Sequence, residues 1–117
     1  MSAELIPAIG YVRVNTALVF TESQNQRQSI IRWAQETGHL IVDWVEDILV
    51  TGKTGDNDVA LDELITRVHE GVASVVVVEG PDRISRQAEV FRHWQSRLTE
   101  AGGHLAWASG MRGDRHE

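Results

Sequence analysis

The four consecutive valines of Val75–Val78 constrain the fold more than any other stretch of the chain. An unbroken run of β-branched residues is typical of a strand that is buried on both faces, as in a parallel sheet covered by helices. Ala73–Val78 is therefore predicted to be an inner strand, and Gly71 is predicted to end the helix that precedes it.

Strand-like and helix-like patterns alternate along the rest of the chain. Short runs rich in β-branched residues predict three more strands, at Ala8–Val14, His39–Val45 and His104–Ala108. Apolar residues at helical spacing predict helices at Thr21–Thr37, with Ile30, Ile31, Trp33 and Ala34 on its apolar stripe, at Val59–Val68, and from Asp82 to about Ala101. Asp82 is the predicted N-cap of the last helix, and the Gly- and Asp-rich Asp47–Asp58 is a predicted loop.

This order predicts a three-layer α/β domain with a mostly parallel central sheet of about four to five strands. The domain is expected to span residues 1–109, followed by a flexible polar tail at 110–117. In such sheets the functional crevice lies beyond the carboxyl ends of the strands. Those ends are expected at Asn15 and Thr16, Asp47–Lys53, Glu79–Arg86, and from Ser109 onward.

The charge of the chain bears on its partners. The formal net charge is -6, whereas proteins that hold duplex DNA by themselves usually carry a positive face. We therefore expect weak or no autonomous DNA binding. No apolar run approaches the roughly 20 residues that cross a bilayer, and no signal peptide is evident, so we expect a cytoplasmic protein with no membrane contact.

Two candidate cofactor signals are excluded. Val50–Thr54 contains Gly-Lys-Thr, but a nucleotide-binding loop needs a glycine at the position of Asp47 and a helix directly after Thr54. The chain has no cysteine, and its five histidines do not show ligand-like spacing. We expect no cofactor and no metal. The four tryptophans, Trp33, Trp44, Trp94 and Trp107, are expected to be mostly core residues, although an exposed pair would mark a partner surface.

Two arginine-bearing segments are the strongest candidates for chemistry. Tyr11–Thr16 ends the first strand, and Gly80–Arg86 joins the third strand to the last helix. From these positions Arg13, Arg83 and Arg86 could converge on one anion, because a guanidinium donates two hydrogen bonds to an oxyanion at once. The alternative is that Asp82 caps the helix while the arginines are solvated in its first turn.

Four short motifs, in this order, resemble the catalytic domain of the serine recombinases (the resolvase/invertase family). Tyr11-Val12-Arg13-Val14-Asn15-Thr16 is similar to the family motif Tyr-x-Arg-Val-Ser-Thr, and Gln26–Ile30 is similar to the start of its first helix. Asp47 with Thr51-Gly52-Lys53 resembles the acidic residue and Ser-Gly loop after the second strand, and Asp82–Arg86 matches Asp-Arg-x-x-Arg. The resemblance extends from Ile9 to about Ser109.

The resemblance implies a metal-free chemistry in which a serine attacks a DNA phosphodiester while arginines neutralise the charge on the phosphate. Arg13, Arg83 and Arg86 would be the remnant of the phosphate-binding site, with Asp47, Lys53, Asp58 and Asp82 around it. Asn15, however, stands at the position of the nucleophilic serine, and its carboxamide has no ionisable hydroxyl. Val19 replaces a family glutamine, and Asp58 reverses the charge of a family arginine.

These departures favour a catalytically inactive recombinase-like domain that acts as an interaction or regulatory module. Its expected partner is a protein, either a second copy or a full-length recombinase whose assembly it joins or blocks. Family members continue into a long helix and a DNA-binding domain, and neither is expected here. The alternatives are an active recombinase domain with an atypical nucleophile and a remnant of a mobile element with no selected role.

Overall fold

The computed structural model describes residues 4–14, 19–48 and 57–109. Its elements follow one another as β1 (Ile6–Val14), α1 (Val19–Thr37), β2 (His39–Ile48), α2 (Asn57–His69), β3 (Val75–Val78), the short 3₁₀ helix η1 (Pro81–Arg83), α3 (Ala88–Glu100) and β4 (His104–Trp107). The strands form one four-stranded sheet in the order β2-β1-β3-β4, and every neighbouring pair is parallel. The predicted α/β class and parallel sheet are confirmed.

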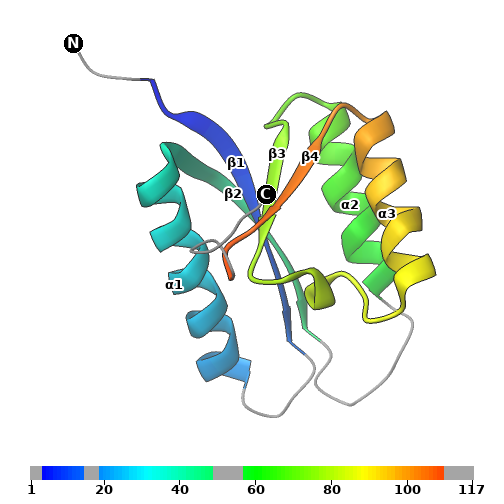
Figure 1. Ribbon diagram of the computed structural model, residues 1–117, viewed down its shortest axis with the longest axis horizontal. Helices are drawn as coiled ribbons and strands as arrows, with labels where there is room; N and C mark the ends of the chain where they lie inside the picture. Colours follow the sequence, from blue (N-terminus) through cyan, green and yellow to red (C-terminus); the bar gives the residue numbers. More distant parts are fainter. Residues whose placement is uncertain (1–3, 15–18, 49–56, 110–117) are drawn as a thin grey trace.

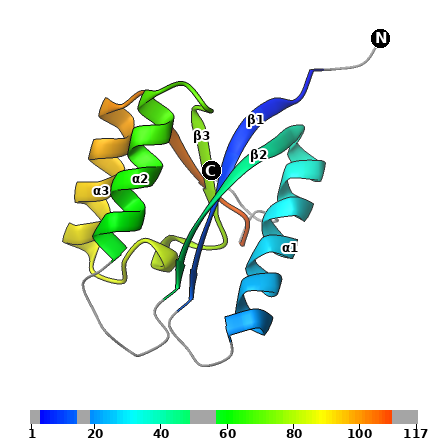
Figure 2. The same ribbon diagram turned by 180° about the vertical axis from the view of Figure 1, so that it is seen from behind.

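The helices lie on both faces of this sheet. Helix α1 covers one face, and α2 and α3 cover the other, which gives the three predicted layers (Figures 1 and 2). Because all four strands are parallel, their carboxyl ends lie at the same end of the sheet. Within the described part of the chain, no helix is both long enough and apolar enough to cross a membrane.

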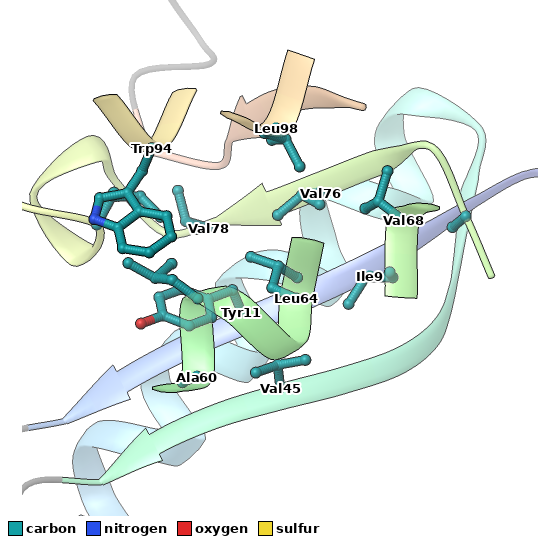
Figure 3. Close-up of a cluster of buried hydrophobic side chains, with 13 residues drawn as sticks. Ile9, Tyr11, Val45, Ala60, Leu64, Val68, Val76, Val78, Trp94 and Leu98 are labelled. Atoms are coloured by element: carbon teal, nitrogen blue, oxygen red, sulfur yellow. The ribbon is translucent and has the colours of Figure 1, made fainter. Parts of the chain in front are cut away.

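Strand β1 supplies side chains to both hydrophobic layers. Ile9 and Tyr11 point toward α2 and α3, where they pack with Val76 and Val78 of β3 (Figure 3). Helices α2 and α3 complete this cluster with Leu61, Leu64, Val68, Trp94 and Leu98. Each of these helical residues is buried, and burying such a side chain contributes roughly 1.5–3 kcal/mol relative to leaving it exposed.

The opposite face of β1 packs against α1. Ala8, Val12 and Val14 of β1 join Val77 of β3 in this second cluster, and α1 contributes Ile30, Trp33 and Ala34. Val76, Val77 and Val78 are all 0% exposed, which confirms that the valine run is buried on both faces of the sheet. Ile31 does not belong to the buried stripe: it is 41% exposed, because one helical step turns it away from Ile30.

The polypeptide between β3 and α3 differs from the prediction. The chain forms η1 at Pro81–Arg83 and begins α3 only at Ala88, where the N-cap residue Gln87 makes no side-chain cap. Asp82 therefore does not cap the long helix. Pro81 accounts for the separate turn, since proline favours the first turn of a helix. Ile84, which is 4% exposed, then enters the core, so η1 does not continue into α3.

One further expectation needs correction. Asp47 lies in β2 and not in a loop, because the β1–β2 ladder extends through the pairs Arg13–Asp47 and Val14–Ile48. The tryptophans are mostly core residues, as predicted: Trp33 and Trp94 are buried and Trp44 packs against the second cluster, whereas Trp107 is 40% exposed on the edge strand β4. The predicted tail at 110–117 lies outside the described residues.

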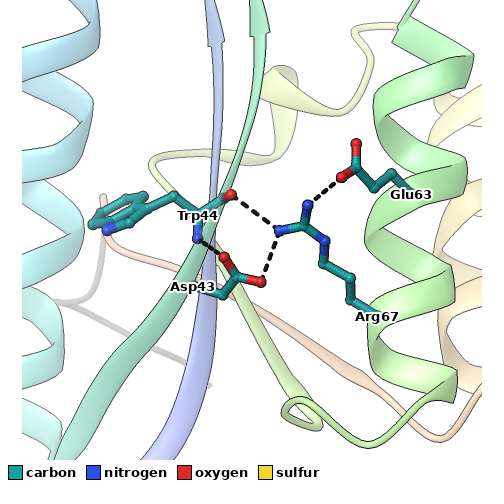
Figure 4. Close-up of polar contacts among 4 residues, drawn as sticks. All are labelled: Asp43, Trp44, Glu63 and Arg67. Atoms are coloured by element: carbon teal, nitrogen blue, oxygen red, sulfur yellow. Dashed lines mark hydrogen bonds and ion pairs between the residues drawn. The ribbon is translucent and has the colours of Figure 1, made fainter.

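In the middle of β2, the other edge strand of the sheet, side chains bind the backbone polar groups of one residue. The backbone N–H of Trp44 donates to Asp43 Oδ1 at 2.9 Å, and the backbone carbonyl of Trp44 accepts from Arg67 Nη1 at 3.3 Å (Figure 4). Arg67, on α2, also donates to Asp43 Oδ2 at 2.7 Å and pairs with Glu63. These contacts tie α2 to β2 and occupy backbone groups to which another strand would bind.

Candidate functional site

The predicted site residues that the structure describes lie at or just after the carboxyl ends of the strands. Arg13 is the penultimate residue of β1, and Asp47 is the penultimate residue of β2. Glu79 directly follows β3, and Arg83 is the last residue of η1. The parallel topology brings these segments to one edge although they are far apart in the sequence (Figure 1).

Arg13 and Asp47 face each other across the β1–β2 pair. They are register partners, and Arg13 Nε lies 3.8 Å from Asp47 Oδ2. The hydroxyl of Tyr11 also points at Asp47 Oδ2, at 3.5 Å. Asp47 is only 7% exposed, and a buried carboxylate needs an opposite charge or hydrogen-bond donors. The sequence analysis placed Asp47 around the three arginines, and in the structure it lies against Arg13.

Burial of Tyr11 changes its ionisation. Loss of solvent raises the pKa of the Tyr11 phenol well above its ordinary value of 10.0, and the negative charge of Asp47 raises the pKa further. The positive charge of Arg13 acts in the opposite direction. Tyr11 is therefore a neutral donor to Asp47 at physiological pH.

Gln26 of α1 fixes the backbone of Arg13. Its Nε2 donates to the Arg13 carbonyl at 2.8 Å, and its Oε1 accepts from the Arg13 N–H at 3.2 Å. β3 pairs with β1 only at residues 8–10, so the Gln26 carboxamide takes a place that no strand fills. Gln26 is 0% exposed. The sequence motifs predicted no role for this side chain, although its spacing from Ile30 and Trp33 places it on the buried face of α1.

Arg83 is held by two carboxylates. Its Nη2 and Nε lie 2.8 and 3.2 Å from Glu79 Oε1, one helical turn earlier in the chain. Glu22, in the first turn of α1, places its Oε1 3.9 Å from the same Nη2. Glu22 was not named from the sequence, and Glu79 was named only as the start of an expected strand end, because neither belongs to the two arginine-bearing segments.

The three predicted arginines line one cleft. It has a volume of about 440 Å³ and is lined by Arg13, Asp82, Arg83, Ser85, Arg86 and Gln87. Arg86 is exposed and makes no polar contact within the described parts of the chain, whereas Ser85 Oγ accepts from the Gln87 N–H at 3.0 Å. Arg13 Nε is buried and has no hydrogen-bond acceptor among the described residues, because Asp47 Oδ2, at 3.8 Å, is too far for a hydrogen bond. Guanidinium groups around a polar cleft of this kind can hold an oxyanion.

The remaining predicted residues are not all placed. Asn15 and Lys53 lie outside the described residues, and Asp58 lies in the first turn of α2 with its side chain outside the description. In residues 4–14, 19–48 and 57–109, no three His, Asp or Glu side chains are grouped closely enough to hold a metal ion.

One protein-family model matches most of the chain. The model of the resolvase N-terminal domain family matches residues 8–116. The C-terminal catalytic domain of ISC1926 TnpA, an IS607-like serine recombinase, is similar with a TM-score of 0.73 and 21% identity over 93% of this chain and 71% of that one. A search of curated proteins finds no match.

Two further solved structures share the fold. The N-terminal catalytic domain of TP901-1 integrase has a TM-score of 0.73 and 20% identity, over 87% of this chain and 77% of that chain. A resolvase family site-specific recombinase from Streptococcus pneumoniae has a TM-score of 0.75 and 20% identity, over 88% of this chain and 72% of that chain. At these identities the likeness to the solved structures shows a common fold.

Proposed function

The chain belongs to the resolvase N-terminal domain family of serine recombinases, and from that membership we propose that it is a catalytically inactive recombinase-like domain. It acts in the cytoplasm as an interaction or regulatory module in site-specific DNA recombination. The observation that carries the proposal is Asn15, which follows the strand that holds Arg13 and stands where the family motif has its serine. A carboxamide cannot supply the alkoxide that attacks a phosphodiester.

The charges around the cleft support this proposal. Arg13 pairs with Asp47, and Arg83 pairs with Glu79 and Glu22, so two of the three arginines already have carboxylate partners. Electrostatic stabilisation of a transition state needs donors that are aimed at the developing charge and free to receive it. A site that lacks the family's nucleophilic serine and has carboxylates on two of its three arginines is suited to binding or regulation.

The first test is for a covalent intermediate. The chain is incubated with supercoiled plasmid carrying a recombination site and quenched with SDS, beside an intact serine recombinase as the positive control. We expect no nicked product and no protein–DNA adduct from this chain. An adduct that survives SDS and is removed by protease would contradict the proposed inactivity.

The second test is for a protein partner. We propose that the partner is a second copy of the chain or a full-length recombinase. The tagged chain is mixed with a full-length recombinase, and co-purification and inhibition of recombination are measured together. A regulator should co-purify and change the recombination rate. If the chain neither co-purifies with the recombinase nor changes the recombination rate, and is monomeric in solution, the proposal of a protein partner is contradicted.

One observation favours the alternative of an active domain with an atypical nucleophile. Ser85 lies in the same cleft as Arg13, Arg83 and Arg86, and it is the hydroxyl-bearing side chain among the described residues that line it. If the plasmid assay gives an adduct, Ser85→Ala should abolish it. An adduct that persists in Ser85→Ala would exclude Ser85 as the attacking group.

A further inference from the structure

Arg83 differs from the other two cleft arginines because carboxylates from two separate elements contact its guanidinium. Glu79 is its i−4 neighbour, with the closest contact at 2.8 Å. Glu22 reaches it from α1, with a longer contact of 3.9 Å. All three side chains are partly exposed, at 27% for Arg83, 26% for Glu79 and 35% for Glu22. Solvent can therefore reach this group of charges, and so can a dissolved anion.

Among the described residues, carboxylates outnumber arginines around the cleft before any ligand arrives. The positive groups are Arg13, Arg83 and Arg86. The negative groups in the cleft or paired with these arginines are Asp47, Glu79, Glu22 and Asp82. Three positive and four negative charges sum to -1, so these described groups exert no net attraction on an anion. An oxyanion that engages Arg83 must compete with the carboxylates already there.

The two glutamates differ in how easily their carboxylates can move away from Arg83. Glu79 lies four residues before Arg83 in the chain, just ahead of η1, so its carboxylate stays close to Arg83 whatever binds. Glu22 approaches from another element and from a greater distance. Gln26, one turn further along α1, is hydrogen-bonded to the backbone of Arg13 and anchors the helix. The Glu22 side chain can therefore leave Arg83 while α1 remains in place.

We propose that Glu22 is a built-in competitor for the anion site, which occupies Arg83 until an external oxyanion displaces it. The proposal rests on the cleft being the remnant phosphate site of the proposed function. Glu22 then sets how weakly the cleft binds oxyanions, and anion binding is coupled to release of the contact between α1 and η1. The ligand class is a compact oxyanion such as sulfate or a phosphate group.

The test compares two substitutions that change the net charge equally. In Glu22→Gln the competitor is removed. In Glu36→Gln the same charge is removed near the other end of α1, where Glu36 is exposed and makes no polar contact with the described residues. Sulfate is the probe because its charge stays constant near neutral pH. Its dissociation constant is measured from the amide NMR shifts of Ser85 and Gln87, which line the cleft.

We expect Glu22→Gln to bind sulfate about three- to tenfold more tightly than the parent chain at low salt, since one close negative charge is removed. Glu36→Gln should change the affinity by less than about 1.5-fold, because its distance leaves only a screened effect. The gain from Glu22→Gln should disappear in an Arg83→Gln background, as a double-mutant cycle requires for a direct contact.

Three outcomes would overturn the proposal. The first is an equal effect of Glu22→Gln and Glu36→Gln, which would mean that only net charge matters. The second is a gain that persists when Arg83 is replaced. The third is no sulfate binding even in the Glu22→Gln/Glu79→Gln double variant, which would also remove the cleft as an anion site. The proposed loss of catalysis is judged separately, by the covalent adduct, and does not depend on these results.

Discussion

The carboxamide of Gln26 binds both backbone polar groups of Arg13, donating at 2.8 Å and accepting at 3.2 Å. This side chain substitutes for a strand at the point where β1 passes beyond the end of its pairing with β3. It links the buried face of α1 to the residue that brings the first arginine to the cleft. The position of Arg13 therefore depends on a helix residue with no charge of its own.

Replacing Gln26 with leucine should destabilise the domain. The change keeps the side chain near its size but leaves the Arg13 N–H and carbonyl without their partner, which costs about 2 kcal/mol or more. Urea unfolding measures the loss. Gln28→Leu is the matched control, because Gln28 is exposed on the same helix and its replacement should stay within about 0.5 kcal/mol. Equal losses would show that the Gln26 contacts contribute little.

Much of the fold could be predicted because local pattern and tertiary environment agree. The valine run at Val75–Val78 is unbroken because β3 is covered by helices on both faces, and the sequence shows this directly. The break between η1 and α3 could not be predicted in the same way. It depends on Ile84 entering the core formed by other elements, whereas local sequence from Asp82 onward is compatible with a continuous helix.

The candidate site was predictable in its arginines and in Asp47, but not in the two glutamates that pair with Arg83. Arg13, Arg83 and Arg86 were placed together because strand ends in a parallel sheet converge and because they belong to recognisable motifs. Contact between Glu22 and Arg83 depends on where the first turn of α1 lies relative to η1, which no local pattern specifies. Gln26 did carry a signal, since a polar residue at the spacing of Ile30 and Trp33 should be buried with a partner.

Restoring the serine alone should not restore catalysis. We expect Asn15→Ser to form no SDS-stable adduct, because Val19 and Asp58 still replace two supporting groups and Arg83 stays paired with Glu79. The plasmid assay with SDS quenching checks this, with an intact recombinase domain as the positive control. An adduct from the single variant would show that the serine was the one missing group.

Duplex DNA should bind very weakly. The chain carries a net charge of -6, and although residues 82–97 contain four arginines, Arg83 pairs with Glu79 and Arg97 with Asp62. We expect a dissociation constant weaker than about 100 μM at physiological salt, at the weak end of non-specific binding. Fluorescence anisotropy with labelled duplexes measures it. Binding that survives moderate salt would reveal a positive surface elsewhere in the chain.

Removing Arg67 should open the edge of β2. Arg67→Ala leaves the Trp44 carbonyl and Asp43 Oδ2 without the Arg67 donor, while Asp43 Oδ1 still accepts from the Trp44 N–H. The change should cost about 1 kcal/mol, given partial exposure of the pair. The freed edge should also increase self-association, measured by light scattering against concentration. Arg97→Ala is the control, because it removes the same charge and an ion pair of 2.7 Å away from the sheet edge. Equal self-association of both variants would show that net charge, and not the edge, governs the effect.

Alkaline pH should destabilise the domain through Tyr11. The folded chain holds the pKa of Tyr11 above its ordinary value of 10.0, first by burial and then through Asp47, whereas the unfolded chain ionises near that value. The stabilising contribution is complete below the unfolded pKa and is lost as pH rises through the folded one. Above pH 10 the unfolding free energy should fall by up to about 1.4 kcal/mol per pH unit from this group.

The composition of the chain allows the ionisation of Tyr11 to be measured without a contribution from any other tyrosine. Tyr11 is the only tyrosine in the sequence, so ultraviolet absorbance of tyrosinate reports on it alone. We expect no tyrosinate signal while circular dichroism remains native, and a simultaneous change in both when the chain unfolds. Tyr11→Phe should remove this part of the alkaline loss, because phenylalanine has no proton to release. Tyrosinate that forms near pH 10 in a chain that is still folded would mean that the Tyr11 hydroxyl is reached by water, and the buried contact with Asp47 would then have to be abandoned.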